Sequence, residues 1–218
     1  LQYLGMRGIC YVELTVRTAK LDAHSGLGGS IFPNAAWRLA WALSTLKDQS
    51  EKILIPGFYD NVQSPGDRDK ELLAALPDNA ANMMKTYGLK GFLKGMTGGV
   101  DLRRAEVFEP TCTICGLTAG YQGDGSKTVL PAEASAKVDF RLVPDQTPQE
   151  VLEKLRKHLD GQGFQDVVIT DLGGDYPART DPDHPFIKLS NEAAREVYGK
   201  PPVVYPLIGG CGSALPFI

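Results

Sequence analysis

The chain has 218 residues, of which 43% are apolar and 22% charged, so it can bury a large core and form one domain, or one domain and part of another. Its formal charge of −3 gives no broad basic field, which argues against nucleic acid and anionic membranes as partners and favours small molecules or peptides. No segment has the uninterrupted apolar length of a membrane span, and the first residues lack a signal-peptide pattern. We therefore expect a cytoplasmic protein.

The first predicted element is a half-buried strand over residues 8 to 17. One face carries apolar residues and the other carries polar ones: Cys10, Val12, Leu14 and Val16 against Glu13, Thr15 and Arg17. A glycine-rich stretch follows. Pro33 then opens an amphipathic helix that is predicted to end near Lys47.

The next segment, from about residue 49 to residue 110, has weak periodicity and recurring Pro-Gly and Gly-Gly pairs, which indicates an insertion with short helices. Strands are predicted again at residues 111 to 119, which are rich in Thr, Cys and Ile, and at residues 134 to 143, where apolar and polar residues alternate.

A capped helix and a fourth strand complete this pattern. Thr147-Pro148-Gln149-Glu150 combines a capping box with proline at the first helical position, and the helix is predicted to run to Gly161. Residues 167 to 169 predict the last strand. The order strand, helix, insertion, strand, strand, helix, strand predicts an α+β fold with the βαββαβ order of ferredoxin-like domains.

Beyond Pro177 the pattern changes. A helix is predicted at residues 185 to 199, and the glycine-rich turn of residues 209 to 213 is followed by nothing that would complete a layer. We therefore expect a first domain over residues 6–178, with its insertion at about 49–110, and a fragment of an α/β domain over residues 179–218.

Two residues of the first domain are candidates for chemistry. His24 follows the first strand in an exposed loop, where a histidine can donate a hydrogen bond to a developing oxyanion; the alternative is a structural role at the strand end. Arg141 lies on the polar side of its strand and can bind a substrate carboxylate through two parallel hydrogen bonds. Its alternative is a surface ion pair with Asp139, two residues away on the same face.

The segment from Gly123 to Thr128 has the composition of a phosphate loop but not its pattern. A P-loop has glycine directly before Lys-Ser/Thr and a helix afterwards, whereas here Ser126 precedes Lys127 and a strand is predicted next. A hairpin turn is the favoured interpretation, with Thr128 as an exposed hydroxyl.

Candidate metal ligands are scattered. His158 lies at the end of a helix, where the dipole favours a cation, and His184 precedes another helix with its role open. Cys112-x-x-Cys115 has no second pair, and on a strand its two side chains point to opposite faces. Because a zinc enzyme usually needs at least three converging protein ligands, we expect no metal site in this chain.

Four groups of residues together carry a family resemblance. They are Arg7-Gly8 with Asp22-Ala23-His24-Ser25-Gly26 and Pro33-Asn34-Ala35; Lys127-Thr128-Val129-Leu130-Pro131 with Phe140-Arg141-Leu142-Val143-Pro144; Asp183-His184-Pro185-Phe186; and Gly209-Gly210-Cys211-Gly212-Ser213. This set resembles metallopeptidase family 20, which includes carnosinases, cytosolic nonspecific dipeptidases, aminoacylases and succinyl-diaminopimelate desuccinylase. The insertion favours its carnosinase-like branch.

The resemblance implies a lid (dimerisation) domain followed by a piece of the catalytic domain. In this family two zinc ions, a bridging water and an acidic general base hydrolyse an amide bond, and the lid of the partner subunit completes the site. His24 would then stabilise the oxyanion across a homodimer, and Arg141 would bind the terminal carboxylate of a small peptide. Further substrate contacts would come from Thr128, His184, Gly210, Cys211 and Gly212.

Two departures from the family limit this interpretation. Cys211 stands where the family usually has serine, which weakens hydrogen bonding, and Ser213 replaces a common proline. The zinc ligands of the family lie before the lid and after the Gly-Gly turn, so this fragment by itself is expected to bind no zinc and to be inactive. Two alternatives stay open: a non-catalytic ferredoxin-like self-association module, and a nucleotide-binding protein that uses the turn at residues 123 to 128.

Overall fold

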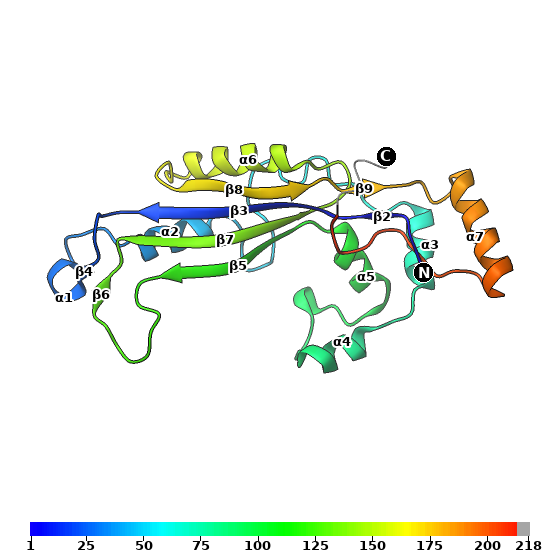
Figure 1. Cartoon of the computed structure of the whole chain (residues 1–218), viewed down its shortest axis with the longest axis horizontal. Coiled ribbons are helices and arrows are strands. Elements are labelled where there is room, and N and C mark those ends of the chain that lie inside the picture. Colours follow the sequence, from blue (N-terminus) through cyan, green and yellow to red (C-terminus); the bar gives the residue numbers. More distant parts are fainter. Residues whose placement is uncertain (213–218) are drawn as a thin grey trace.

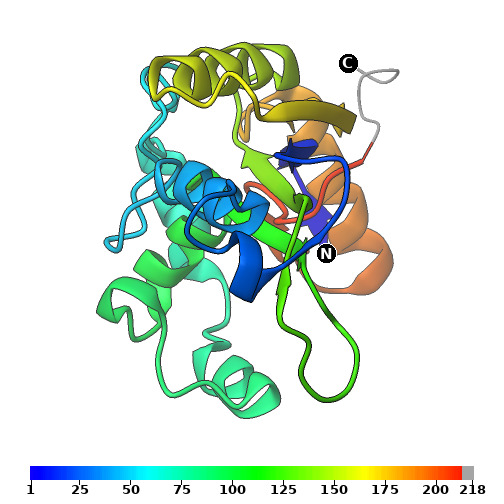
Figure 2. The ribbon, with the colours of Figure 1, turned by 90° about the vertical axis from the view of Figure 1, so that its left-hand side faces the viewer.

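The computed structural model describes residues 1–212, and its centre is an antiparallel sheet in the strand order β5-β7-β3-β8 (Figure 1). The strands are β3 (Gly8–Arg17), β5 (Thr111–Ala119), β7 (Glu133–Leu142) and β8 (Val168–Asp175). Two helices, α2 (Ala35–Ser44) and α6 (Pro148–Gly161), cover one face of the sheet (Figure 2). The predicted α+β class and the predicted order of these elements are confirmed.

The core lies between the sheet and its two helices. β3 pairs with β7 along its whole length, from Gly8 opposite Leu142 to Arg17 opposite Glu133. Because side chains alternate along a strand, every second residue of the pair faces the helices. These residues are exposed by 2% or less: Cys10, Val12, Leu14, Val16, Ala134, Ala136, Val138, Phe140 and Leu142.

The start of α2 is set by a cap. The Asn34 side chain accepts hydrogen bonds from the amides of Ala36 (2.9 Å) and Trp37 (3.2 Å), so Pro33 lies before the cap and outside the helix. The helix ends at Ser44, earlier than predicted, because Lys47 already pairs with Ile53 in an isolated bridge.

The start and end of α6 are as predicted, but its capping box is only half formed. The Thr147 hydroxyl accepts from the Glu150 amide at 3.2 Å. The Glu150 carboxylate does not return to the cap, because it accepts from Lys154 (2.6 Å) and Asn61 (3.0 Å).

The insertion contains short helices, as predicted, but it packs in two directions. Its helices are α3 (Asp67–Ala75), α4 (Ala80–Tyr87), η1 (Leu93–Gly95) and α5 (Gly99–Phe108). The residues before them join the main core through Ile53, Ile55 and Phe58. Helices α3 and α5 instead build a second cluster with the C-terminal part of the chain: Leu73, Leu76, Val107, Phe108 and Leu207.

Short strand pairs tie the two ends of the described chain to that second cluster. β1 (Gln2–Tyr3) is parallel to β10 (Val204–Tyr205), and β2 (Gly5–Met6) is antiparallel to β9 (Ala178–Arg179). Helix α7 (Pro185–Tyr198) lies beyond this end of the sheet (Figure 1). The domain boundary near residue 178 stays a prediction, and it falls within β9.

The opposite end of the sheet carries a smaller pair of strands. β4 (Ala23–His24) pairs with β6 (Val129–Leu130), and the one-turn helix α1 (Ser25–Gly28) follows β4. The segment at residues 123 to 128 therefore leads into a strand, as predicted, within the connection from β5 to β7. In the part of the chain that the structure describes, no helix combines the length and apolar character needed to cross a bilayer.

Candidate functional site

His24 and Thr128 meet at the β4–β6 end of the sheet. The His24 Nδ1 atom accepts a hydrogen bond from the Gly26 amide at 3.1 Å. In a neutral imidazole the proton is therefore on Nε2, which lies 2.9 Å from the Thr128 hydroxyl oxygen. His24 is exposed, and its Nε2–H group donates to the Thr128 hydroxyl, which holds the ring in this tautomer. This is the form that oxyanion stabilisation requires.

Arg141 lies near the other end of β7, between an acid and a thiol. Its Nε atom is 3.3 Å from Asp139 Oδ2, so the ion pair considered as an alternative is present. Its Nη1 atom is also 3.1 Å from the Cys211 sulfur, 70 residues further along the chain. The guanidinium is thus held from two sides and keeps N–H donors for a ligand.

Arg7 fixes the backbone beneath this group, a role that the sequence reasoning missed. Only 5% exposed, Arg7 donates to the carbonyls of Glu106 (2.9 Å), Glu109 (2.7 Å) and Arg141 (3.5 Å). Burial, reinforced by the neighbouring Arg141 charge, lowers the pKa of Arg7 to about 10. The available signal was an arginine directly before a buried strand.

Arg7 also holds the glycine-rich turn near Arg141. The Arg7 amide hydrogen is shared between the carbonyls of Ile208 (3.2 Å) and Gly210 (3.1 Å). This contact places Gly210, Cys211 and Gly212 next to the start of β3. Ser213, the last residue of the predicted turn, lies outside the described residues.

His184 caps α7. Its Nδ1 atom accepts from the Phe186 amide at 3.2 Å, so its position before the helix is as predicted, and the cap is a contact that the sequence left open. His158 is not simply a cation at a helix end: it is 6% exposed, and its Nε2 atom lies 3.0 Å from the Thr45 carbonyl.

The two groups of site residues lie at opposite ends of one strand pair. Arg141 is opposite Ile9, at the start of β3, whereas His24 follows the end of β3. Arg141 is eight residue steps along β7 from Glu133, which at about 3.3 Å per residue is about 26 Å. His24 and Arg141 of one chain are therefore too far apart to contact the same dipeptide.

The described residues do not fit a zinc site. Among residues 1–212, no group of three or more His, Cys, Asp or Glu side chains is placed to hold a metal ion. Cys112 is buried in the core, and Cys115 is exposed next to a bulge in β5. Burial raises the pKa of Cys112 to about 12, which disfavours the thiolate that zinc needs.

The class of protein follows from comparison with known families. The family model of the peptidase dimerisation domain of M20 peptidases matches residues 4–167, and the chain belongs to this family. That range contains the α+β sheet domain with His24, Thr128 and Arg141. His184 and the glycine-rich turn lie beyond it.

Particular relatives agree with this assignment. The chain is 28% identical over 158 residues to the Cys-Gly metallodipeptidase DUG1 of Candida albicans and 30% identical over 156 residues to the Beta-Ala-His dipeptidase of Rattus norvegicus. Each match covers 72% of this chain but only 32% and 31% of these relatives. The chain therefore spans about a third of their length along the matched region.

A solved structure shows the same fold. An M20 family metallo-carboxypeptidase from Sulfolobus solfataricus superposes with a TM-score of 0.89 at 37% identity, over 96% of this chain and 53% of that one. Human carnosine dipeptidase 1 superposes with a TM-score of 0.82 at 24% identity, which supports the fold alone. The resemblance to family 20 and its dipeptidases is confirmed.

Proposed function

We propose that this chain is the lid (dimerisation) domain and an adjoining catalytic-domain piece of a cytoplasmic, homodimeric dizinc metallopeptidase that hydrolyses the amide bond of dipeptides or N-acyl amino acids. The observation that carries the proposal is the separation of His24–Thr128 from Arg141–Cys211 at opposite ends of the sheet. A two-fold dimer resolves this separation, because it reverses the strand direction of the second copy.

The edge strand β5 offers the surface for that dimer. Helices α2 and α6 lie over the other three strands, and two apolar helix-side residues of β5 stay uncovered: Ile114 is 52% exposed and Leu117 is 61% exposed. Helix α2, which packs on the neighbouring strand β7 and on β3, also exposes the stacked pair Trp37 and Trp41, which are 60% and 54% exposed. A second copy would bury these side chains and extend the sheet.

Two-fold pairing through β5 also supplies the chemistry. The His24–Thr128 end of one subunit then lies toward the Arg141–Cys211 end of the other. In this arrangement Arg141 binds the substrate carboxylate through its remaining N–H donors, and the partner's His24 redirects its Nε2–H group from Thr128 to the oxyanion. We assign further substrate contacts to Thr128, His184 and the turn at residues 210–212.

The exposed apolar face of α7 is evidence for a larger catalytic domain. Its apolar side chains Phe186, Leu189 and Val197 are 67%, 62% and 75% exposed, although their spacing is that of a buried helix face. We propose that the remaining catalytic domain covers this face and supplies the zinc ligands. Zinc analysis of the full-length protein tests this point; a metal-free active enzyme would contradict it, whereas a metal-free inactive protein would favour the non-catalytic self-association module.

Subunit complementation tests the shared site. In the full-length enzyme we expect His24→Ala and Arg141→Ala each to lower turnover or substrate affinity strongly, with a loss on the order of 10²-fold in turnover for His24→Ala. Mixing the two variants creates heterodimers with one intact site, so about a quarter of the wild-type activity should return. If subunits exchange but no activity returns, His24 does not act across the dimer.

A further inference from the structure

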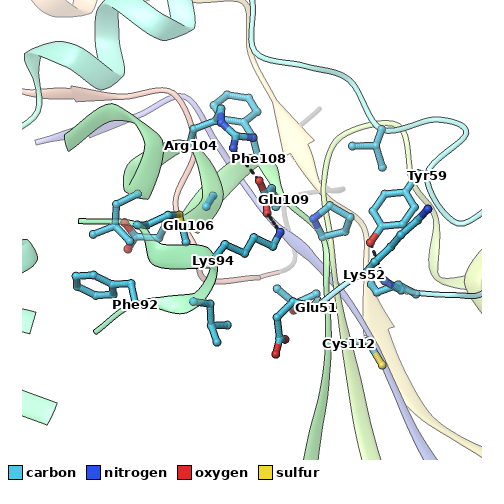
Figure 3. A pocket seen from close by; sticks show the side chains of 18 of the residues that line it. Glu51, Lys52, Tyr59, Phe92, Lys94, Arg104, Glu106, Phe108, Glu109 and Cys112 are labelled. Carbon is cyan, nitrogen blue, oxygen red and sulfur yellow. Dashed lines mark hydrogen bonds and ion pairs between the residues drawn. The ribbon is translucent and has the colours of Figure 1, made fainter. Parts of the chain in front are cut away.

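A cavity of about 630 Å³ lies between the loop after α2 and the insertion helices, across the start of β5 (Figure 3). This volume is within the range of about 300–1,000 Å³ that small-molecule sites occupy. None of His24, Thr128, Arg141, His184 and the turn at residues 210–212 lines it. The cavity is therefore separate from the proposed active site.

Most of the cavity wall is apolar and comes from distant parts of the chain. The loop after α2, helix α4, the residues around η1, and the α5–β5 junction all contribute. The apolar residues of the wall include Ile53, Met83, Phe92, Met96, Leu102 and Pro110. Met83 and Met96 can adapt their shape to an apolar ligand, and Phe92 offers a flat aromatic surface.

A three-residue charge cluster with one surplus positive charge lines the same cavity. Lys94 Nζ lies 3.0 Å from one oxygen of Glu109, and Arg104 Nη2 lies 2.9 Å from the other (Figure 3). Burial alone would raise the pKa of Glu109, but its contacts with Lys94 and Arg104 outweigh burial and lower that pKa, so the carboxylate stays ionised. Two cations thus share one anion.

The other charged groups of the wall are balanced. Lys47 pairs with Glu51 at 2.7 Å, and Glu106 pairs with Arg103 at 2.9 Å. Lys52 has Asp48 as its acidic neighbour. The uncompensated charge therefore belongs to the Lys94–Glu109–Arg104 cluster.

Lys94 also has an unfavourable backbone conformation. Its φ of 55° and ψ of 21° lie in the left-handed region, which costs a non-glycine residue about 1 kcal/mol. Backbone strain of this kind concentrates at binding sites. The strained residue carries one of the two cations.

We propose that this cavity binds a small monocarboxylate with an apolar or aromatic body. The carboxylate accepts hydrogen bonds from Lys94 and Arg104, whose ammonium and guanidinium groups have more donors than Glu109 uses. The body of the ligand packs against Phe92 and Met96. This inference does not depend on the proposed peptidase activity.

Calorimetric titration of the chain with 3-phenylpropionate and its neutral isostere 3-phenylpropanamide, at low ionic strength, tests the proposal. We expect saturable one-site binding of the acid, with the amide weaker by about tenfold or more. Arg104→Gln and Lys94→Gly should reduce the affinity for the acid to that for the amide. Lys94→Gly relieves the backbone strain as it removes the charge, so lost binding would not reflect unfolding.

Two control variants test whether the loss of binding is specific to the cavity. Lys200→Gln, in the segment after α7, and Arg141→Ala, at the candidate active site, should keep the wild-type affinity. The proposal is overturned by absence of saturable binding at millimolar acid, by equal affinity for acid and amide, or by wild-type affinity in Arg104→Gln. Lost binding in Arg141→Ala would also overturn it, because the ligand would then occupy the other site.

Discussion

At the scale of single residues, the environment of Arg141 explains how a half-exposed side chain can hold one orientation. Asp139 contacts its Nε atom, while the Cys211 sulfur contacts Nη1. The other carboxylate oxygen of Asp139 is buried and has no hydrogen-bond partner among residues 1–212. Asp139 is therefore a positioning residue whose charge is directed at Arg141.

This arrangement predicts the effect of Asp139→Asn in the full-length enzyme. The variant keeps the shape of the side chain but loses its charge, so the KM for a substrate with a free carboxylate should rise about fivefold, since partly exposed ion pairs contribute on the order of 1 kcal/mol. The kcat should change little. Glu13→Gln, on β3 opposite Lys137, is the matched control. An equal KM rise for substrates with a blocked carboxyl group would contradict this role.

His158 predicts a pH dependence of stability. Burial lowers the pKa of His158 below its ordinary value of 6.5, against the opposing effect of its hydrogen bond to Thr45. The unfolded chain therefore binds a proton at a higher pH than the folded chain, and the free energy of unfolding falls as pH decreases below about 6.5. Denaturant unfolding at pH 7.5 and 5.5 measures this.

The control for that measurement is His158→Gln, which lacks the titrating ring. Carboxylates contribute equally in both proteins, so the difference between their pH profiles isolates the histidine. Stability should fall less for His158→Gln than for the wild type. Parallel profiles would show that His158 is protonated equally in the folded and unfolded chains.

At the scale of elements, α6 shows which features could be read from the sequence. Thr147, Pro148 and the spacing of its leucines predicted its start, its end and its buried face, because caps and amphipathic periods act within one or two turns. The Glu150 half of the capping box did not form, because its carboxylate binds Lys154, one turn along the same helix, and Asn61, 89 residues away.

The cap itself gives a stability prediction. Thr147→Ala removes the acceptor for the Glu150 amide and should lower the free energy of unfolding by about 1 kcal/mol. Thr147→Ser keeps the hydroxyl and should stay close to the wild type. Equal losses in both variants, measured by denaturant titration, would assign the effect to the threonine methyl group instead.

The insertion was the least predictable element. Its short helices were expected from the Pro and Gly pairs, but their partners were not. Ile53 and Phe58 join the main core, whereas Val107 and Phe108 pack against Leu207, about a hundred residues away. No hydrophobic periodicity within the insertion predicts which of the two clusters a residue joins.

At the scale of the whole molecule, one edge of the sheet differs from the other. Leu117 on β5 and Val168 on β8 are 61% and 59% exposed, but α6 packs on β8, whereas α2, which exposes the stacked Trp37 and Trp41, packs on β3 and on β7, the neighbour of β5. If the dimer forms through β5, Leu117→Lys should shift sedimentation toward the monomer, because a buried unpaired charge opposes association. Val168→Lys should associate like the wild type, and the reverse pattern would place the interface at β8.

The sequence by itself determined the strands, the two covering helices, the family and the identities of His24, Thr128 and Arg141, since these depend on short periods, caps and motifs. Only the tertiary structure decided that His24 contacts Thr128, that Cys211 reaches Arg141, and that these two pairs lie at opposite ends of the sheet. It also placed Arg7 beneath Arg141 and gathered the cavity around Lys94 and Arg104. Those contacts join residues that are about 70 or more positions apart in the sequence, or segments of the insertion that lack hydrophobic periodicity. Their geometry is set by how the layers pack rather than by neighbouring residues.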